Sequence, residues 1–446
     1  MASDVAPALV TGSGVASATV GEQRTTPAFR RLVLASSLGS AIEHYDFFIY
    51  AFTAPIVFDA VFFPKLNPIN GLIAVYATFA IGFVARPLGG MVFGHFADRI
   101  GRKYILTLTL LTMGVASFLI GCLPSYLTIG ILAPILLVSF RFLQGFAFGG
   151  EYMNAVTLNL ESAPSARRGF FASWVNASGP AGIIIAAGLI SLLGYVYGKD
   201  EFQSWIWRIP FMLSFVLVGI GVYIRLKVDE PLLFQAVLAE NKVRKVPLLT
   251  VLRAWKKSTV LALLVNMVHS SFQYLCTIFV LGYAVKQLGV SQTGVTTGTM
   301  LANIVEMAAV PLIAFYSDGF GRRPFIIAGI ILAALWFPIY FQLVEQKDVI
   351  LLVFGLVVSV GLIHALMFAP EAAFTAELFP TEVRVTGGSL GKQLGIIFGG
   401  GIAPLVATSL MREGASFAPV IGYFEVMAVL ALIGILIAPE NYKRAL

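Results

Sequence analysis

The ten residues Gly94-His95-Phe96-Ala97-Asp98-Arg99-Ile100-Gly101-Arg102-Lys103 decide how this chain is interpreted, because a second version of them follows nearly half a chain length later. The second version reads Ala314-Phe315-Tyr316-Ser317-Asp318-Gly319-Phe320-Gly321-Arg322-Arg323. Each version comes directly after a long apolar run. Self-similarity at such a separation indicates an internal duplication.

Two further matches support the duplication. Glu151 and Glu371 are separated by the same distance in the sequence as the two versions of the motif. The pattern Glu161-x-x-Pro164-x-x-x-Arg168 returns as Glu377-x-x-Pro380-x-x-x-Arg384, at almost the same separation. Three matches in equivalent places predict that the chain consists of two related halves.

The composition predicts that both halves lie in a membrane. Of the 446 residues, 58% are hydrophobic and 12% are charged, against roughly 25% charged residues in a soluble domain. The apolar runs fall at 32–57, 72–94, 104–123, 130–160, 169–197, 207–226, 258–285, 295–316, 325–343, 349–376, 386–410 and 417–438. Because each is long enough for a transmembrane helix, we predict an all-α membrane protein with 12 transmembrane helices in two pseudo-symmetric six-helix bundles.

The same runs predict the organisation of the chain. The predicted segments are an N-terminal cytosolic tail (1–30), two six-helix bundles (31–227 and 258–438), a central cytosolic loop (228–257) and a C-terminal tail (439–446). Most Lys and Arg residues fall in the tails, the central loop and the loops on the same side. The opposite side holds only Lys65, Lys199, Arg208, Lys286, Lys347 and Arg412. By the positive-inside rule we expect a multi-pass cell (inner) membrane protein with both termini in the cytosol.

Several classes of function find no support in the sequence. There is no G-x-x-x-x-G-K phosphate loop and no G-x-S-x-G or H-E-x-x-H motif, so we expect neither an enzyme nor an ATP-driven pump. Cys122 and Cys276 lie in separate apolar runs without metal-ligand spacing. The net charge of +7 comes from short loops between apolar runs, which argues against nucleic acid. We expect a monomer without cofactors whose partners are a small molecule, protons and the lipid bilayer.

The motifs resemble those of the major facilitator superfamily. The stretch 94–103 is similar to the signature loop of that superfamily, and its second version at 314–323 fits it too. Within the superfamily, the chain is most similar to the metabolite:proton symporters, which include carriers of shikimate, citrate, 2-oxoglutarate and proline/betaine. The residues that carry this likeness are Glu43-His44-Tyr45-Asp46-Phe47, Arg86-Pro87-Leu88-Gly89-Gly90, Arg141-x-x-Gln144-Gly145, Phe148-Gly149-Gly150-Glu151, Asp229-Glu230-Pro231 and Thr386-Gly387-Gly388-Ser389-Leu390-Gly391. His44 and Lys392 depart from the family pattern, which leaves the substrate open.

Charged residues inside the spans are the candidates for proton coupling, because each one is costly in lipid. Glu43 and Asp46 stand three residues apart and share one helix face. Two neighbouring carboxylates resist double ionisation, so one of them could bind and release a proton. Arg141 could govern this exchange, since an anionic substrate would compete for it. We expect Glu43, Asp46 and Arg141 to face one aqueous cavity; the alternative is a structural ion pair between spans 1 and 4.

The resemblance implies alternating access by the two bundles around a central site lined by spans 1, 4, 7 and 10. The candidate substrate-binding residues are Arg141, Lys392, Tyr45, Gln144, Glu151 and His364. Lys392 could equally belong to a gate. For His364 the alternative is a hydrogen-bonded residue that fills a helix interface.

The resemblance also implies a latch between the bundles on the cytosolic side, formed by a second set of residues. These residues are Gly94, Asp98, Gly101, Arg102, Glu161, Arg168, Asp318, Arg322, Glu377, Arg384 and Arg86. Asp98 can accept from a helix N-terminus or pair with basic partners. The alternative is a solvated loop that only sets the orientation of the chain.

The sequence therefore favours a secondary active transporter that takes up a small organic acid together with protons. Two alternatives of the same class are a proton symporter of a zwitterion such as proline or betaine, and a drug/proton exporter. An alternative of another class is a membrane sensor or scaffold that transports nothing. The charges along spans 1 and 4 argue against a scaffold, which has no use for them.

Overall fold

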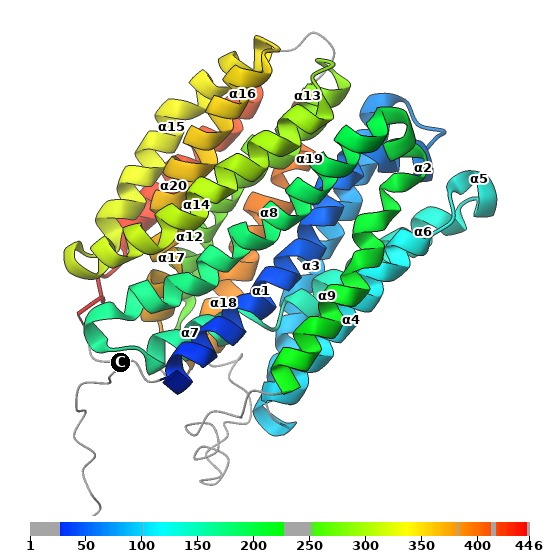
Figure 1. Ribbon diagram of the computed structural model, residues 1–446. Coiled ribbons are helices and arrows are strands. Elements are labelled where there is room, and N and C mark those ends of the chain that lie inside the picture. The colour runs from blue at the N-terminus through cyan, green and yellow to red at the C-terminus, as the bar shows by residue number, and fades with distance from the viewer. Residues whose placement is uncertain are drawn as a thin grey trace, which may run out of the picture.

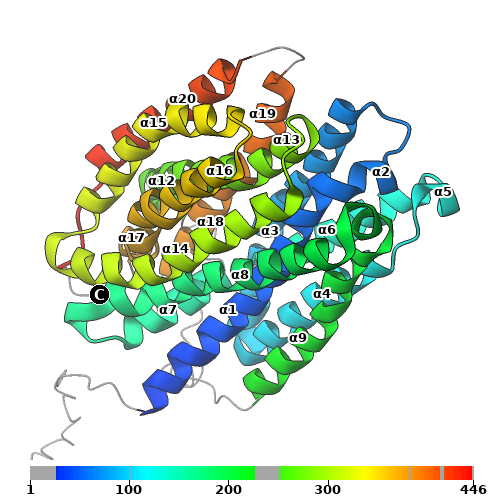
Figure 2. The same cartoon turned by 45° about the horizontal axis from the view of Figure 1, so that its top comes forward.

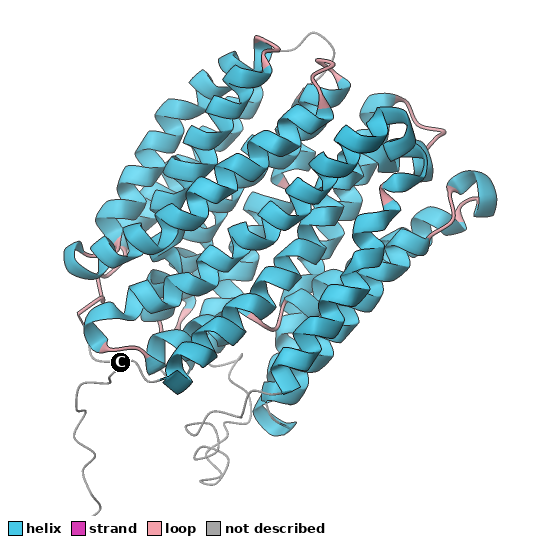
Figure 3. Cartoon of the chain, viewed as in Figure 1, coloured by secondary structure: helices cyan, strands magenta, loops and turns pink. Residues whose placement is uncertain are grey.

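The computed structural model describes residues 27–100, 102–226, 251, 253–380, 383–411 and 416–443. Within these residues the chain is helical, with short loops and no strands (Figure 3). The described ends of the chain, at Pro27 and Lys443, lie at the same end of the molecule, which we call the terminus end (Figure 1).

The first half of the chain supplies six membrane-spanning segments. Its elements are α1 (Pro27–Thr53), the π-helical η1 (Ala54–Phe58), α2 (Asp59–Phe62), α3 (Pro68–Ile100), α4 (Arg102–Cys122), α5 (Tyr126–Ile129), α6 (Leu132–Phe148), α7 (Tyr152–Ser162), the 3-10 turn η2 (Ser165–Arg167), α8 (Arg168–Glu201), η3 (Phe202–Ile206) and α9 (Arg208–Leu226).

The second half supplies six more. Its elements are α12 (Lys256–Tyr274), the π-helical η4 (Leu275–Phe279), α13 (Val280–Lys286), α14 (Gln292–Phe320), α15 (Arg323–Glu345), α16 (Val349–Leu356), the π-helical η5 (Val357–His364), α17 (Ala365–Glu377), α18 (Arg384–Ile396), the π-helical η7 (Ile397–Gly401), α19 (Ala403–Leu410) and α20 (Ala418–Ile437).

The outer surface of the molecule is suited to lipid. In the described part of the chain, ten helices are long and apolar enough to cross a membrane, and two shorter apolar helices span Thr107–Cys122 and Arg208–Tyr223. Large apolar side chains such as Leu335 and Val426 are exposed, whereas charged side chains deep in the spans, such as Arg141 and Glu371, are buried. The predicted fold, two six-helix halves in a membrane, is confirmed.

Glycine lets α3 and α6 pack with their backbones in contact. A Cβ atom on Gly145 would collide with the carbonyl oxygen of Gly82, and one on Gly89 with that of Phe146. Close approach of this kind is typical of membrane helices, where small residues allow van der Waals contact between backbones. It also fixes the register of Arg86 on α3 against Arg141 on α6.

The two halves meet along two pairs of helices. One pair is α8 and α14, which lie side by side in both views (Figures 1 and 2). The other is α3, which packs against α18, η7 and α19. Spans 2 and 11 are therefore neighbours across the interface, and Arg86 on α3 faces the same cavity as Lys392 on α18.

The predicted boundaries at residues 30, 227, 257 and 438 lie close to helix ends, and they stay predictions. The N-terminal tail and most of the central loop, including Asp229 and Glu230, lie outside the described residues.

Candidate functional site

A cavity lies between the two halves, and helices from both halves contribute its wall. The polar part of the wall consists of His44, Arg86, Tyr152, His269, Ser270, Gln273, Tyr274, Lys392 and Gln393. The apolar part is mostly aromatic and includes Phe47, Phe48, Phe148 and Phe368. Two cations in a buried, largely aromatic wall suit a small molecule that carries negative charge.

Lys392 is the cation from the second half. Its Nζ lies 2.8 Å from Oε2 of Glu371 on α17 and 3.8 Å from the centre of the Tyr152 ring. Both Lys392 and Glu371 are buried. Because a buried charge needs a partner, the ion pair and the aromatic face together hold the ammonium in place.

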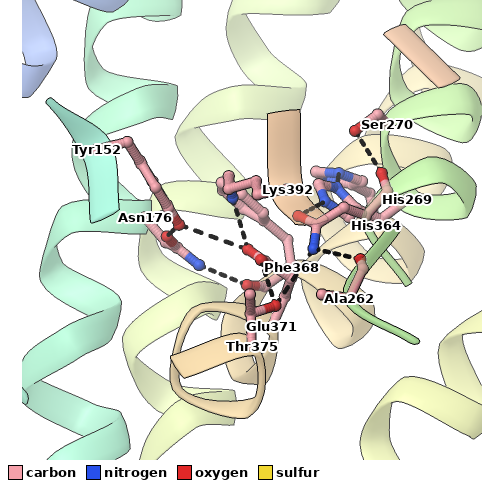
Figure 4. Close-up of polar contacts among 11 residues, drawn as sticks. Tyr152, Asn176, Ala262, His269, Ser270, His364, Phe368, Glu371, Thr375 and Lys392 are labelled. Carbon is pink, nitrogen blue, oxygen red and sulfur yellow. Dashed lines mark hydrogen bonds and ion pairs between the residues drawn. The ribbon is translucent and has the colours of Figure 1, made fainter. Parts of the chain in front are cut away.

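Tyr152 and Asn176 connect this ion pair to the first half (Figure 4). The Tyr152 hydroxyl lies 3.4 Å from Glu371 Oε2 and donates a hydrogen bond to Asn176. Asn176 in turn donates through Nδ2 to the carbonyl oxygen of Phe368, at 2.6 Å. Polar contacts therefore cross the interface between the halves directly beside the cavity.

Arg86 is the cation from the first half, and it lies among aromatic rings. Its Cζ is 4.3, 4.2 and 4.1 Å from the ring centres of Phe47, Phe83 and Phe148. Tyr274 from α12 and the carboxylate of Glu43 are the polar groups that interact with it. The ring faces lower the cost of burying a guanidinium, which is weakly hydrated.

Arg141 lies behind the cavity wall. Its Cζ is 4.2 Å from the centre of the Phe47 ring, which Arg86 also contacts, and Arg141 is not among the residues that line the cavity. Its Nη1 donates to Gln144 Oε1 at 3.1 Å, and Gln144 Nε2 donates to the Ser117 hydroxyl at 2.7 Å.

Glu43 and Asp46 point toward different neighbours. Glu43 is buried and interacts with Arg86. Asp46 is fully buried and faces Ser214 of α9. The wall of the central cavity contains neither carboxylate. Glu43, Asp46 and Arg141 therefore do not line this cavity, and the expectation that they share an aqueous cavity stays a prediction.

The terminus end carries a network of charges centred on Arg322. Its Nη2 lies 2.7 Å from Asp318 Oδ1 and 3.3 Å from Glu377 Oε1. Burial lowers the pKa of this guanidinium, but Glu377 and Asp318 together raise it above its ordinary value. Glu440 completes the network by accepting from the backbone N–H groups of Arg322 and Arg323.

Two contacts of this network cross between the halves. Asp318 on α14 accepts from the backbone N–H groups of Gly169 and Phe170, at 2.9 Å each, and so caps the N-terminus of α8. Arg384 on α18 donates to Glu161 on α7 at 2.8 Å. Arg168 lies near Glu377 and Arg384.

The first version of the repeated motif cannot be compared in the same way. The side chains of Asp98 and Arg102, the surroundings of Gly94 and all of Gly101 lie outside what the structure describes. The arrangement found at Asp318 and Arg322 is therefore known only for the second half.

The opposite end of the molecule is also joined across the halves. Lys286 at the end of α13 forms an ion pair with Asp59 at the start of α2. Tyr76 on α3 donates to the carbonyl oxygen of Ile278 in η4 at 2.9 Å. In this conformation the cavity is therefore bounded by contacts between the halves at both ends.

Comparison with known proteins identifies the family. The family described as Sugar (and other) transporter matches residues 32–244, and the Major Facilitator Superfamily matches residues 261–444. The inner membrane metabolite transport protein YhjE of Escherichia coli (strain K12) is 38% identical over 95% of this chain and 98% of its own length. The chain belongs to the metabolite:proton symporter family of the major facilitator superfamily. It is thus a multi-pass membrane transporter of small molecules and not an enzyme.

Other relatives in this family differ in the substrates that their names give. The shikimate transporter of Escherichia coli (strain K12) is 34% identical, with 92% of each chain covered. The proline/betaine transporter of Salmonella typhimurium is 33% identical over 94% of this chain and 85% of its own. The solved structure of the xylose transporter XylE from E. coli, in a partially occluded inward-open conformation, matches with a TM-score of 0.72 at 18% identity, over 94% of this chain and all of that one. The last likeness shows the superfamily fold alone.

Of the six residues predicted to bind substrate in this transporter, Lys392 lies in the cavity wall. The other five, which lie outside this wall, are Arg141, Tyr45, Gln144, Glu151 and His364. The Tyr45 hydroxyl donates to the carbonyl oxygen of Pro210 on α9 at 2.7 Å. Glu151 occupies the break between α6 and α7. As substrate contacts these five stay predictions.

Most residues of the wall, among them His44, Tyr152 and Tyr274, were not among the predicted site residues. His44 was singled out only as a departure from the family pattern; its Nδ1 donates to the Ser40 carbonyl oxygen at 2.7 Å. Tyr152 and Tyr274 gave no signal, because an aromatic residue within an apolar span is usually part of the core. No group of three His, Cys, Asp or Glu residues that could hold a metal ion occurs in the described parts of the chain.

Proposed function

We propose that the transporter uses the proton gradient, without a cofactor, to take up a small organic acid by alternating access. The observation that carries this proposal is the pair of buried cations, Arg86 and Lys392, that face one cavity from opposite halves. A carboxylate between them would be bound by charge-assisted hydrogen bonds, which are about twice as strong as neutral ones.

Each cation already has a carboxylate partner, and this supplies a way to couple substrate to protons. Lys392 pairs with Glu371, and Arg86 interacts with Glu43. A substrate anion competes for the cation and leaves the carboxylate without a partner. An unpaired charge inside the membrane costs about 2.5–3.5 kcal/mol, so the freed carboxylate binds a proton. Substrate and proton are then carried together.

Asp46 and Arg141 keep a role in this proposal although they lie outside the cavity wall. Asp46 is fully buried and faces a hydroxyl group, so we assign it a proton that it releases when α1 moves against α9. Arg141 shares the Phe47 ring with Arg86, so a movement of Phe47 on substrate binding would reach both cations.

The contacts at the two ends of the molecule would act as gates. Asp318, Arg322, Glu377, Glu161 and Arg384 would close the terminus end, and Lys286 with Asp59 would close the other. We place the terminus end in the cytosol because the basic loops lie there. A transporter of this kind functions as a monomer in the bilayer, since each chain contains a complete cavity.

A zwitterionic solute is the second candidate. The aromatic wall formed by Phe47, Phe48 and Tyr274 would suit the quaternary ammonium group of betaine, and three relatives are named as proline/betaine transporters. The two cations argue against it, because they would repel that ammonium group.

Transport by purified protein in proteoliposomes tests the proposal. With an imposed pH gradient, acid outside, we expect labelled shikimate to accumulate and labelled glycine betaine to remain at the same concentration on both sides. Lys392→Met should abolish accumulation, because the substrate carboxylate loses a cation. Lys257→Met, which removes an exposed lysine from the start of α12, is the matched control and should transport normally.

Three results would reject the proposal. These are accumulation that does not depend on the gradient, accumulation of betaine in place of every carboxylate offered, and normal shikimate uptake by Lys392→Met.

A further inference from the structure

Three buried ionisable side chains of the second half form a cluster that reaches the cavity wall at one member. They are Glu306 on α14, His364 at the end of η5 and His269 on α12. His364 Nδ1 is hydrogen-bonded to Glu306 Oε1, and His364 Nε2 lies 3.3 Å from His269 Nδ1. Figure 4 shows the two imidazoles beside each other. Phe368 packs against both rings, with ring centres 5.1 Å from His364 and 5.5 Å from His269.

Asn266 fixes the direction of the hydrogen bonds in this cluster. Its Nδ2 lies 2.8 Å from the carbonyl oxygen of Ala262. A backbone carbonyl only accepts, so the amide nitrogen must face Ala262 and the amide oxygen must face the other way. That oxygen, Oδ1, lies 3.3 Å from His269 Nε2. His269 therefore carries a hydrogen on Nε2.

The protons on the other ring follow from this. If His269 is neutral, its Nδ1 is an acceptor, and His364 must donate to it from Nε2. The Nδ1 atom of His364 then has two options: it carries a second hydrogen, which makes the ring a cation, or it accepts a hydrogen from a protonated Glu306. If His269 is itself a cation, the additional proton resides there. Every arrangement holds one proton more than two neutral histidines and a carboxylate would hold.

We propose that Glu306, His364 and His269 together hold a transported proton, at a site separate from the carboxylates of α1. This proposal rests on proton-driven transport as the function of the chain and names a binding site for the coupling ion. His269 is the member of the triad that lines the cavity, so the proton enters and leaves through its imidazole.

The charged groups around the triad connect it to the substrate site. Lys392 on α18 is close enough to interact electrostatically with His269. Asn266 also donates to the Thr375 hydroxyl at 3.2 Å, and Thr375 donates to Glu371 Oε1 at 3.0 Å. Lys392 thus acts on both the triad and Glu371. Binding of a substrate anion to Lys392 removes a positive charge from the surroundings of His269 and favours a proton there.

Nitrogen-15 NMR of the histidines in the full-length protein in lipid tests where the proton resides. The chain has four histidines, His44, His95, His269 and His364, so each signal can be assigned by a single His→Gln substitution. At neutral pH we expect a hydrogen on Nε2 of His269, together with one of three states: His364 as a cation, His364 with its hydrogen on Nε2, or His269 itself as a cation. A neutral His269 together with a neutral His364 that carries its hydrogen on Nδ1 would overturn the proposal, since Glu306 would then be ionised and no additional proton would be present.

Transport tests whether this proton moves. Glu306→Gln keeps the shape of the side chain but cannot bind a proton. In proteoliposomes it should lose gradient-driven accumulation of labelled shikimate and retain exchange of labelled for unlabelled shikimate. Glu345→Gln, at the exposed end of α15, is the matched control and should behave as wild type.

The two proposals can fail separately. Full accumulation by Glu306→Gln would overturn the assignment of a transported proton while leaving proton-driven transport intact. Absence of accumulation in the wild-type protein would reject the proposed function. A proton still seen by NMR in that case would be a structural one, and the assignment of a transported proton would be overturned with it.

Discussion

Lys392 shows how a charged side chain is stabilised inside this membrane protein. Its ammonium has a carboxylate at 2.8 Å and a tyrosine ring at 3.8 Å. Breaking such a pair leaves a buried charge and costs about 3–5 kcal/mol, whereas removing both charges is close to neutral. The pair thus adds little net stability, and its position beside the cavity agrees with the role in substrate binding proposed above.

This difference predicts the stability of variants at the pair. Lys392→Met should lower the free energy of unfolding by about 3 kcal/mol or more, because Glu371 is left without its cation. The double variant Lys392→Met/Glu371→Gln should recover most of the loss. Thermal unfolding in detergent, followed by intrinsic fluorescence, measures both.

The pair between Lys286 and Asp59 provides the control. Both of its side chains are 16% exposed, so Lys286→Met should cost less than Lys392→Met. A double variant of Lys392 and Glu371 that is as unstable as the single one would contradict this account.

At the scale of the helices, the breaks and π-helical segments within the spans could not be predicted from the sequence. The apolar run at 130–160 predicted one helix, but the structure divides it into α6 and α7. The π-helical segments η1 and η4, which begin at Ala54 and Leu275, occupy equivalent places in the two halves. Gln203 donates to the carbonyl oxygen of Ile56 in η1. Because Gln203 and Ile56 are distant in sequence, no local sequence pattern predicts their contact or the break that it accompanies.

The directions in which Glu43 and Asp46 point could not be predicted from the sequence either. A spacing of three residues leaves two side chains about 60° apart around a helix. That angle suffices for Glu43 to reach Arg86 while Asp46 faces Ser214. The sequence correctly placed both within one span and on one side of it. It could not tell which neighbouring helix each would meet, because that depends on the packing of α1 against α3 and α9.

Glycine packing between α3 and α6 gives a prediction for these helices. Gly145→Ala places a methyl group against the carbonyl oxygen of Gly82. That oxygen belongs to the backbone of α3, so it cannot move away as a flexible side chain could. Overpacking of this kind costs about 1–3 kcal/mol, and we expect a lower melting temperature and weaker transport. Gly219→Ala on α9 meets nothing within 4 Å and should leave both unchanged. Equal melting temperatures for the two variants would argue against close packing of α3 on α6.

At the scale of the whole molecule, the repeated motif predicted more than any single charge did. It implied two halves and a cluster of charges at one end, and the charges around Arg322 do gather at the terminus end. The pairing inside that cluster was not predictable. Glu161 pairs with Arg384 from the other half, although Arg102 and Arg168 were equally available by sequence. Only the relative position of the two halves selects among them.

Asp318 connects the two halves because its side chain on α14 of the second half caps α8 of the first half. Its carboxylate accepts two N–H groups of α8, where the helix dipole also favours negative charge. Hydrogen bonds to charged groups contribute about 1.5–3 kcal/mol. Asp318→Asn should therefore shift the population toward opening at the terminus end by about ten- to a hundredfold.

The rate at which a cysteine in the cavity reacts measures this shift. Ser270 lines the cavity and is buried, so Ser270→Cys in a background without Cys122 and Cys276 reports on access. Labelling by a maleimide should be slow in this background and faster after Asp318→Asn. Asp348→Asn is the matched control, because Asp348 caps α16 within its own half. If Asp348→Asn accelerated labelling as much as Asp318→Asn, the loss of any helix cap would explain the faster labelling. The contact across the halves would then not hold the terminus end closed.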